Sequence, residues 1–256
     1  MHPQQVATTC GTCHSNETIM KKYGLGTDQV AGYEKSVHGL SVSSGRDLSS
    51  PTCNDCHGDH GALPPTVESS FAVCGHCHVH NRELYASSRK RAAFDDLGEP
   101  GCVACHGHHE ILAPSEEMLS LDPDSYCADC HDDDGSEAST AILRMRASLD
   151  SLRLALERGE IALDEAEQKG MYVTEIRFDL QEPRQRLVRA RTEVHGFTAA
   201  AVEEICGEGQ ALADSVIHAA QGALDEYRFR RSGLAVATLL ISAFAWALYR
   251  KIRTLD

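Results

Sequence analysis

The pattern Cys-x-x-Cys-His occurs five times in the first 131 residues, and it constrains this chain more than any other feature. The five copies lie at residues 10–14, 53–57, 74–78, 102–106 and 127–131. They contain ten of the 11 cysteines, so that only Cys206 lies outside them. The chain also has 14 histidines in 256 residues, far more than a background level. Cysteine and histidine at this fixed spacing indicate a chain built around a bound cofactor.

Two cysteines separated by two residues and followed directly by histidine are typical of covalent c-type haem attachment. The two intervening residues let the backbone make one turn, so that both thiols reach one edge of the porphyrin and form thioethers with its vinyl groups. The histidine then binds the iron as the proximal ligand. We therefore expect five covalently bound haem c groups. The predicted thioether residues are Cys10, Cys13, Cys53, Cys56, Cys74, Cys77, Cys102, Cys105, Cys127 and Cys130. The predicted proximal ligands are His14, His57, His78, His106 and His131.

Other uses of paired cysteines fit this sequence less well. Zinc ribbons combine cysteine pairs in twos, whereas five pairs is an odd number. A redox pair of the thioredoxin type needs a strand–helix–strand context, which the sequence does not indicate. Disulfides that span only two residues would close trivial loops and stabilise the chain little.

The same region has too few residues for an ordinary core. Residues 1–131 provide about 26 residues for each motif, and aromatic residues make up only 5 % of the chain. So short a segment cannot surround each haem with a core of side chains. We therefore expect the macrocycles to form most of the interior and to pack against one another, as in an electron-transfer chain.

Histidines outside the motifs are candidates for the second axial position of each iron. The segments SPTCNDCHGDHGALPP (50–65) and EPGCVACHGHHEILAP (99–114) repeat a histidine three residues after the proximal one. Such a histidine is poorly placed to reach the far face of its own haem, and we expect it to ligate a neighbouring haem. Methionines are scarce here, so mainly bis-histidine ligation and low potentials are expected. The distal candidates are His38, ahead of the second motif, and His60, His109, His80 and His195, with a surface role as the alternative for each.

An irregularity precedes the fourth motif. The pattern Tyr33-x-x-Ser36-x-His38 ahead of the second motif is echoed by Tyr85 to Lys90, which has lysine at the position of His38. Either the fourth haem takes its distal ligand from elsewhere, or one iron has an open or lysine-bound face. An open face would permit substrate chemistry.

The composition changes abruptly after residue 131, and residues 132–231 are predicted to form long helices. Asp134 is the expected N-cap of the first of them, Gly170 indicates a helix stop, and Pro183 indicates the first turn of the next helix. We expect a helical hairpin that leads into a third long helix. The first seam is a heptad of apolar or small residues: Ile142, Met145, Leu149, Leu152, Leu156, Gly159, Leu163 and Ala166. The second seam is predicted at Leu187, Ala190, Val194, Phe197, Ala201, Ile205, Leu212, Val216, Ala219 and Ala223.

Residues 232–249, SGLAVATLLISAFAWALY, are 18 residues without a charge, which is the short end of a transmembrane helix. Trp246 and Tyr249 lie near one end and basic residues follow, as at a membrane interface. Haem is attached to such motifs after export, so we expect residues 1–131 on the periplasmic face of the cytoplasmic membrane and the tail 250–256 in the cytoplasm. The start MHPQQ lacks the apolar run of a secretory signal, so we expect a trimmed chain or a misassigned start.

The five motifs, the CHGxH pairs and the segment YEKSVHG (33–39) resemble the multihaem c-type cytochromes of the class III and hydroxylamine-oxidoreductase-related kind. This resemblance covers about residues 8–131. The membrane-tethered plan is similar to that of the quinol-oxidising cytochromes of periplasmic nitrite and nitrate reduction, although those carry their anchor at the N-terminus. The pentahaem nitrite reductases also join a haem domain to long helices, but here every motif ends in histidine and their lysine-ligated catalytic haem is not reproduced.

The sequence therefore predicts a mostly helical protein. It comprises a loop-rich, haem-packed domain (1–131), a helical hairpin or coiled-coil region (132–231), one transmembrane helix (232–249) and a short cytoplasmic tail (250–256). We expect a pentahaem electron carrier between a membrane oxidoreductase, such as a quinol-oxidising cytochrome b, and periplasmic redox proteins. The alternative is an oxidoreductase that acts on a small nitrogen or sulfur species at one open haem. The net charge of −14 argues against nucleic acid as a partner, because phosphate backbones are bound by clustered Lys and Arg.

Overall fold

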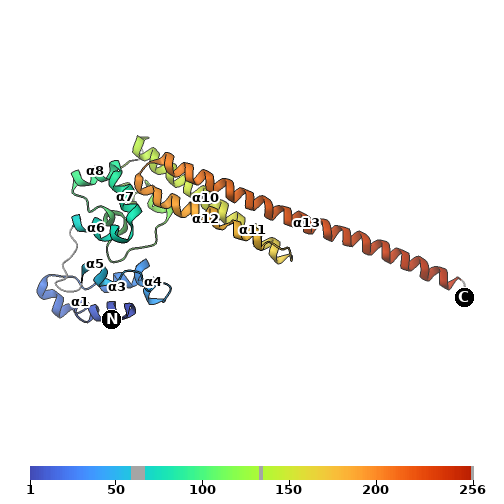
Figure 1. Ribbon diagram of the computed structural model, residues 1–256, viewed down its shortest axis with the longest axis horizontal. Coiled ribbons are helices and arrows are strands. Elements are labelled where there is room, and N and C mark those ends of the chain that lie inside the picture. The colour runs from blue at the N-terminus through green and yellow to red at the C-terminus, as the bar shows by residue number, and fades with distance from the viewer. Residues whose placement is uncertain (59–66, 133–134, 255–256) are drawn as a thin grey trace. The chain divides into compact units, whose positions relative to one another are not determined.

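The computed structural model describes residues 1–58, 67–132 and 135–254 of the chain. These residues form helices joined by turns and loops, with no strand among them, which confirms the mostly helical fold class (Figure 1). They divide into two compact units. One consists of Met1–Ala147 together with Arg191–Val202, and the other of Ser148–Ala190 together with Glu203–Asp256.

The first unit is made of short helices. They are α1 (Pro3–His14), α2 (Glu17–Met20), η1 (Lys21–Tyr23), α3 (Gln29–Lys35), α4 (Val37–Ser43), α5 (Cys53–His57), α6 (Val67–Cys77), α7 (Val79–Ser87), α8 (Arg89–Leu97), α9 (Cys102–His106), η2 (Glu116–Met118) and η3 (Val194–Gly196). Two serines explain part of this segmentation. Ser36 ends α3 and caps α4, because its hydroxyl accepts the Gly39 N–H at 3.0 Å. Ser88 does the same between α7 and α8, where it accepts the Arg91 N–H at 3.2 Å.

Four of the Cys-x-x-Cys-His motifs lie on a helix or at a helix end, and the fifth lies in a hydrogen-bonded turn. The second and fourth motifs are the whole of α5 and α9, and the first forms the last turn of α1. In the third and fifth motifs the histidine N–H donates to the carbonyl of the first cysteine, from His78 to Cys74 at 3.0 Å and from His131 to Cys127 at 2.9 Å. A helical turn places positions i, i+3 and i+4 on one face. The motif geometry that covalent haem attachment requires is therefore present at all five places.

Few apolar side chains are buried in the region of the motifs. Among the described residues up to 131, the buried apolar ones are Met20, Val42, Tyr85, Phe94 and Leu119. A segment of this length that folded on side chains alone would need a larger core. The small core agrees with an interior that is filled by something other than side chains.

The second unit is built from long helices that lie side by side (Figure 1). They are α10 (Glu137–Gln168), α11 (Thr174–Asp179), α12 (Gln181–Glu193) and α13 (Ala199–Arg253), of which α10, α12 and α13 also contribute residues to the first unit. The predicted helix stop is confirmed, because α10 ends at Gln168 and Gly170 follows with a φ of +79°. Pro183 lies in the first turn of α12, as expected. The cap of α10 is Ser136, whose hydroxyl accepts the Ser139 N–H at 3.2 Å, while Asp134 lies outside the described residues.

The heptad seam of α10 is buried as predicted. Apart from Gly159, every seam residue from Met145 to Ala166 is 6 % exposed or less. Gly209 of α13 packs against this seam so closely that an added Cβ would lie 2.7 Å from Leu152 Cδ2 and 3.0 Å from Arg186 Cβ. Three helices therefore meet at Gly209 without room for a side chain.

The second predicted seam is only partly correct. Leu187 and Ala190 are buried on α12, but the helix ends before Phe197, which has a φ of +50°. On α13 the predicted positions Ile205 and Val216 are buried, whereas Ala213, Ala220 and Leu224 are buried in place of their predicted neighbours Leu212, Ala219 and Ala223. The helix break at 194–198 interrupts the heptad, so a repeat counted through it keeps some core positions of α13 and misses others by one residue.

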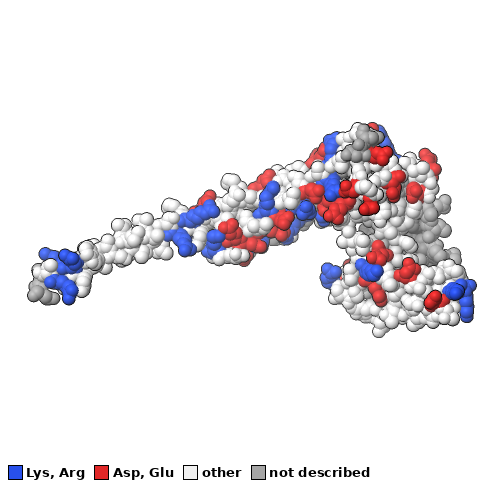
Figure 2. Space-filling view, turned by 180° about the vertical axis from the view of Figure 1, so that it is seen from behind, with Lys and Arg blue, Asp and Glu red and all other residues white. Residues whose placement is uncertain are grey.

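The C-terminal part of α13 has an apolar surface on all sides. Among the described helices α13 is the one that is long and apolar enough to cross a membrane, and its apolar window is not buried. Leu240 and Ile241, which are consecutive, are 66 % and 69 % exposed. Figure 2 shows this stretch without charged residues and with basic clusters on either side. The segment 232–249 is accordingly a candidate membrane span.

Candidate functional site

Successive motifs lie close to one another in the first unit. The thiol of Cys10 lies beside that of Cys53, and burial together with this neighbour raises the pKa of Cys53 to about 11. A hydrogen bond joins the thiols of Cys74 and Cys102, the first cysteines of the third and fourth motifs. Cys56 likewise lies within electrostatic range of Cys77. Cys105 of the fourth motif lies within electrostatic range of Cys127 of the fifth. The five motifs are therefore neighbours in the order of the sequence.

Three motif histidines face a second histidine from outside the motifs. The ring centres of His57 and His109 are 6.1 Å apart, with 26° between the ring planes. The ring centres of His38 and His78 are 6.3 Å apart, at 37°. The ring centres of His106 and His195 are 6.1 Å apart, at 18°. His38, His109 and His195 are three of the five predicted distal candidates.

These separations fit a metal ion held between two imidazoles. With metal–nitrogen bonds of about 2.0 Å and each ring centre about 1.1 Å further out, the two centres lie about 6.2 Å apart. Ring packing alone permits similar distances. The composition of the pairs is more telling than the distance, because each joins one motif histidine with one histidine from outside. By contrast, His108 and His109, which are adjacent in the sequence, have centres only 4.7 Å apart.

The environment of these pairs favours neutral imidazole, the form that binds metal. Burial is the main reason why the pKa values of His38, His106, His109 and His195 lie below the ordinary histidine value. A neighbouring histidine adds to this effect in each case: His78 acts on His38, and His195 acts on His106. A second positive charge beside the first is unfavourable, which further disfavours protonation of these four histidines.

Local structure positions the two distal histidines of the N-terminal region. His38 follows the Ser36 corner on the first turn of α4, and Gly39 lies directly against the Tyr33 carbonyl, where a side chain would clash. His109 lies in the segment after α9, and the Val37 N–H donates to the Ile111 carbonyl at 2.8 Å. This bond ties the segment that carries His109 to the helix that carries His38.

The turn at Ser88, between α7 and α8, is the second serine corner and repeats the one at Ser36, but it has lysine in the place of His38. Ser88 donates its hydroxyl to the Tyr85 carbonyl at 2.7 Å, just as Ser36 donates to the Tyr33 carbonyl at 2.6 Å, so the repeat noted in the sequence is a structural repeat. Lys90, however, has its ammonium 4.5 Å from the centre of the Phe94 ring. The ring that faces His106 belongs to His195 instead. Of the two readings of Lys90, the geometry favours a distal ligand supplied from elsewhere.

The remaining predicted residues are not brought into such pairs in the described part of the chain. His14 is exposed and His131 is half-buried, and neither ring faces another histidine there. His80 lies on the surface, with its Nδ1 3.9 Å from a Glu83 carboxylate oxygen. His60 lies outside the described residues. The described residues therefore place no second histidine ring opposite the histidine of the first or the fifth motif.

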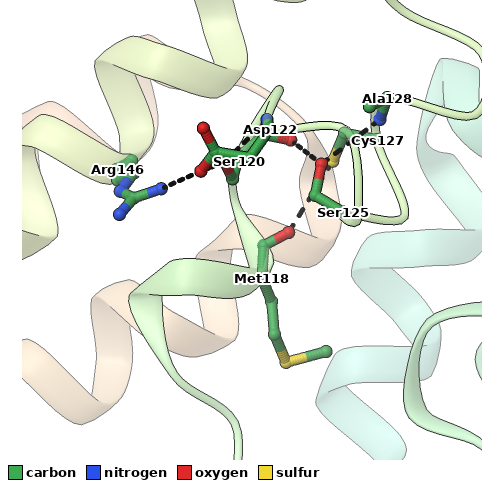
Figure 3. A network of polar contacts seen from close by, with 7 residues as sticks. All are labelled: Met118, Ser120, Asp122, Ser125, Cys127, Ala128 and Arg146. Carbon is green, nitrogen blue, oxygen red and sulfur yellow. Dashed lines mark hydrogen bonds and ion pairs between the residues drawn. The ribbon is translucent and has the colours of Figure 1, made fainter.

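Polar contacts hold the fifth motif in place (Figure 3). The Cys127 thiol donates to the Met118 carbonyl at 3.7 Å, and the Ala128 N–H donates to the Ser125 hydroxyl at 3.4 Å. Arg146 of α10 lies 3.8 Å from the Asp122 carboxylate. The Met118 side chain points away from these contacts in Figure 3, although its carbonyl takes part. The motif is therefore fastened to α10 through the loop that precedes it.

The comparisons with known proteins point the same way. Residues 46–132 match the family model of cytochrome c3. The matched region contains the second to fifth motifs. No curated protein and no solved structure matches the chain significantly. The match supports a multihaem c-type cytochrome with covalently bound haem c, and with it an electron-transfer role.

The sequence predicts the motif residues, but it does not predict which histidine from outside the motifs pairs with which motif histidine. His38 precedes the second motif in the sequence, yet its ring faces that of His78 in the third motif. His195 was a candidate without an assigned site, and it faces the fourth. The identity of these partners depends on contacts between segments far apart in the sequence, for which the sequence carried no signal beyond the histidines themselves.

Proposed function

We propose that this chain is a membrane-anchored pentahaem c-type cytochrome that transfers electrons between a membrane oxidoreductase and periplasmic acceptors. The observation that carries the proposal is the pairing of three motif histidines with half-buried histidines from outside the motifs. His57 and His109 would hold one haem iron from both faces, and His38 and His78 another. The ten motif cysteines would form the thioethers. Bound haem supplies an iron that gains and loses a single electron.

Two axial histidines leave an iron without a free position for a substrate. Such a site transfers electrons without substrate chemistry at the metal. The alternative, catalysis on a small nitrogen or sulfur species at an open haem, rested on Lys90, whose ammonium lies over the Phe94 ring while His195 faces the fourth site. Electron transfer is therefore the function that the geometry supports better.

The neighbour relations of the cysteines support a relay. Contacts between the thiols of the first and second motifs, and between those of the third and fourth, bring successive haem edges together. The second and third motifs and the fourth and fifth are also near one another. A continuous path in sequence order would let electrons enter at one end of the series and leave at the other.

The apolar surface of α13 supports attachment to a membrane. Residues 232–249 would cross the cytoplasmic membrane, with residues 250–256 on the cytoplasmic side and the haem region on the periplasmic side, where c-type haem is attached. A quinol-oxidising cytochrome b in the same membrane is the partner class we propose as electron donor. The net charge of −14 favours soluble acceptors with a basic docking surface.

The experiment that tests this function uses the purified full-length protein in detergent. Mass spectrometry of the mature chain is expected to give a mass increment of five haem c groups, and the dithionite-reduced protein is expected to show c-type bands. The His109→Ala variant is expected to gain one high-spin haem per chain that binds carbon monoxide. His108→Ala is the matched control, since His108 is adjacent but exposed and is expected to leave the spectrum unchanged.

Because His108 lies next to His109, a double variant with both residues changed to alanine is also measured. It is expected to show the same single high-spin haem per chain, with no neighbouring histidine left to take the place of His109. A chain without covalent haem would overturn the proposed function. Carbon monoxide binding by the unmodified protein, together with turnover of nitrite, hydroxylamine or sulfite, would favour the enzymatic alternative.

A further inference from the structure

The histidine of the fourth motif faces His195, which lies in η3 directly after α12. We propose that His195 is the second axial ligand of the fourth haem iron. This inference rests on the proposed function. It assigns a ligand that lies outside residues 46–132, the region that matches a known family. The observation that carries it is the His106–His195 pair, with ring centres 6.1 Å apart and planes only 18° from parallel.

The hydrogen bonding of His195 leaves the correct nitrogen free for a metal. Its Nδ1 lies 2.9 Å from the Thr192 carbonyl oxygen, which only accepts, so Nδ1 carries the proton. The neutral ring therefore has its lone pair at Nε2. A backbone carbonyl that fixes the tautomer in this way is the usual second partner of a metal-binding histidine. Asn81 Nδ2 lies 3.4 Å from Nδ1 and 3.5 Å from Nε2, so the Nε2 lone pair meets a long amide contact that a metal bond would replace.

The elbow that carries His195 is built to hold a fixed position. His195 lies in η3, and the chain leaves this turn through Phe197 in the left-handed region, at a φ of +50°. A residue with a side chain rarely adopts this conformation unless the surroundings impose it. The Lys90 ammonium lies 5.9 Å from the centre of the Phe197 ring, so the lysine that replaces a histidine in the second serine corner helps to hold the elbow.

A partly buried ion pair also fixes this elbow. Arg191 donates from Nε to a Glu116 carboxylate oxygen at 2.8 Å, and the Glu116 side chain is only 9 % exposed. A carboxylate so well shielded from water needs its partner. Glu116 belongs to the segment between the fourth and fifth motifs. The ion pair therefore joins this segment to the residue four places before His195.

A purely structural histidine is the competing explanation. It would account for the partial burial and for the Thr192 hydrogen bond, but it gives no reason for a second half-buried imidazole at metal-bridging distance. It also leaves the fourth site without a ligand, because the local position is taken by Lys90. Ligation by His195 explains both facts. It also makes residues 107–194 an excursion between two residues that would bind one iron.

The test compares His195→Ala with His218→Ala in the full-length haem protein in detergent. His218 is an exposed histidine on α13 and serves as the matched control. Haem content by mass is expected to equal that of the unmodified protein in both, because the thioethers are untouched. In His195→Ala one haem per chain is expected to turn high-spin by electron paramagnetic resonance and to bind one carbon monoxide. Added imidazole is expected to restore the low-spin signal.

A third variant, His195→Met, keeps a ligand and guards against loss of the fold. It is expected to remain low-spin while the potential of one haem rises, because a thioether favours the reduced iron. Spectra and potentials equal to those of the unmodified protein in His195→Ala, or in His195→Met if the alanine variant does not fold, would overturn the assignment. Absence of covalent haem from all variants and from the unmodified chain would instead refute the proposed function.

Discussion

The substitution Gly209→Ala tests how the three long helices pack in the second unit. The added Cβ would lie 2.7 Å from Leu152 Cδ2 and 3.0 Å from Arg186 Cβ. Leu152 is fully buried on α10. The Cβ of Arg186 is fixed to the backbone of α12 and moves only with that helix. The new methyl group can therefore be accommodated only if the buried Leu152 side chain turns and α12 shifts by a few tenths of an ångström.

Two opposing terms set the size of the effect. Alanine is favoured over glycine within a helix by about 1 kcal/mol. Overpacking in a well-packed core costs about 1–3 kcal/mol. Gly207→Ala on the same helix is the matched control, because its Cβ would meet no atom within 4 Å. The propensity term is common to both variants, so the difference between them isolates the packing cost of about 1–3 kcal/mol.

The assay is urea unfolding of the full-length protein in detergent, followed by circular dichroism at 222 nm. The haem absorbance is recorded in parallel, so that loss of the helical bundle is distinguished from loss of the haem region. Gly207→Ala is expected to raise the helical midpoint and Gly209→Ala to lower it relative to that control. Equal shifts for the two variants would refute close packing at Gly209.

Two further predictions concern the fourth site and the membrane. Lys90→Ala is expected to leave the low-spin haem spectrum unchanged and to bind no added carbon monoxide, because the ammonium lies over Phe94 and not at an iron; a new carbon monoxide band would show that Lys90 is a ligand. Leu240→Arg places a charge at the middle of the apolar stretch of α13 and is expected to cost about 3 kcal/mol of insertion free energy. Membrane fractionation should then recover more of this variant in the soluble fraction than of Gln221→Arg, an exposed position on the same helix outside the apolar stretch.

Features with local causes could be predicted from the sequence. The cysteines and histidine of each motif are within five residues of one another, so a single helical turn fixes their relation and no other part of the chain is needed. The seam of α10 was predictable for the same reason, because Leu149 and Leu163 belong to one uninterrupted period. The apolar surface of residues 232–249 also follows from composition alone.

Features that depend on a break in the chain could not be predicted in this way. Several core positions of α13 were predicted one residue early, because Phe197 adopts a left-handed conformation that interrupts the heptad between α12 and α13. Nothing in the residue type announces this conformation, since phenylalanine disfavours it. The packing around it, including the Lys90 ammonium 5.9 Å from the Phe197 ring, is a tertiary effect.

The same distinction separates the two axial positions of each haem site. The proximal histidine follows its cysteines directly, so its place is set by covalent geometry. A proposed distal histidine must be brought there by folding, and the second histidine of the three described pairs comes from α4, from the segment after α9 and from η3. Few buried apolar side chains lie among the motifs, so this delivery has little conventional core to guide it. The segments that carry these histidines are held instead by the serine caps, by a close contact at Gly39 and by the Arg191–Glu116 ion pair. The positions of the distal candidates are therefore specified by backbone and polar contacts and not by a hydrophobic pattern.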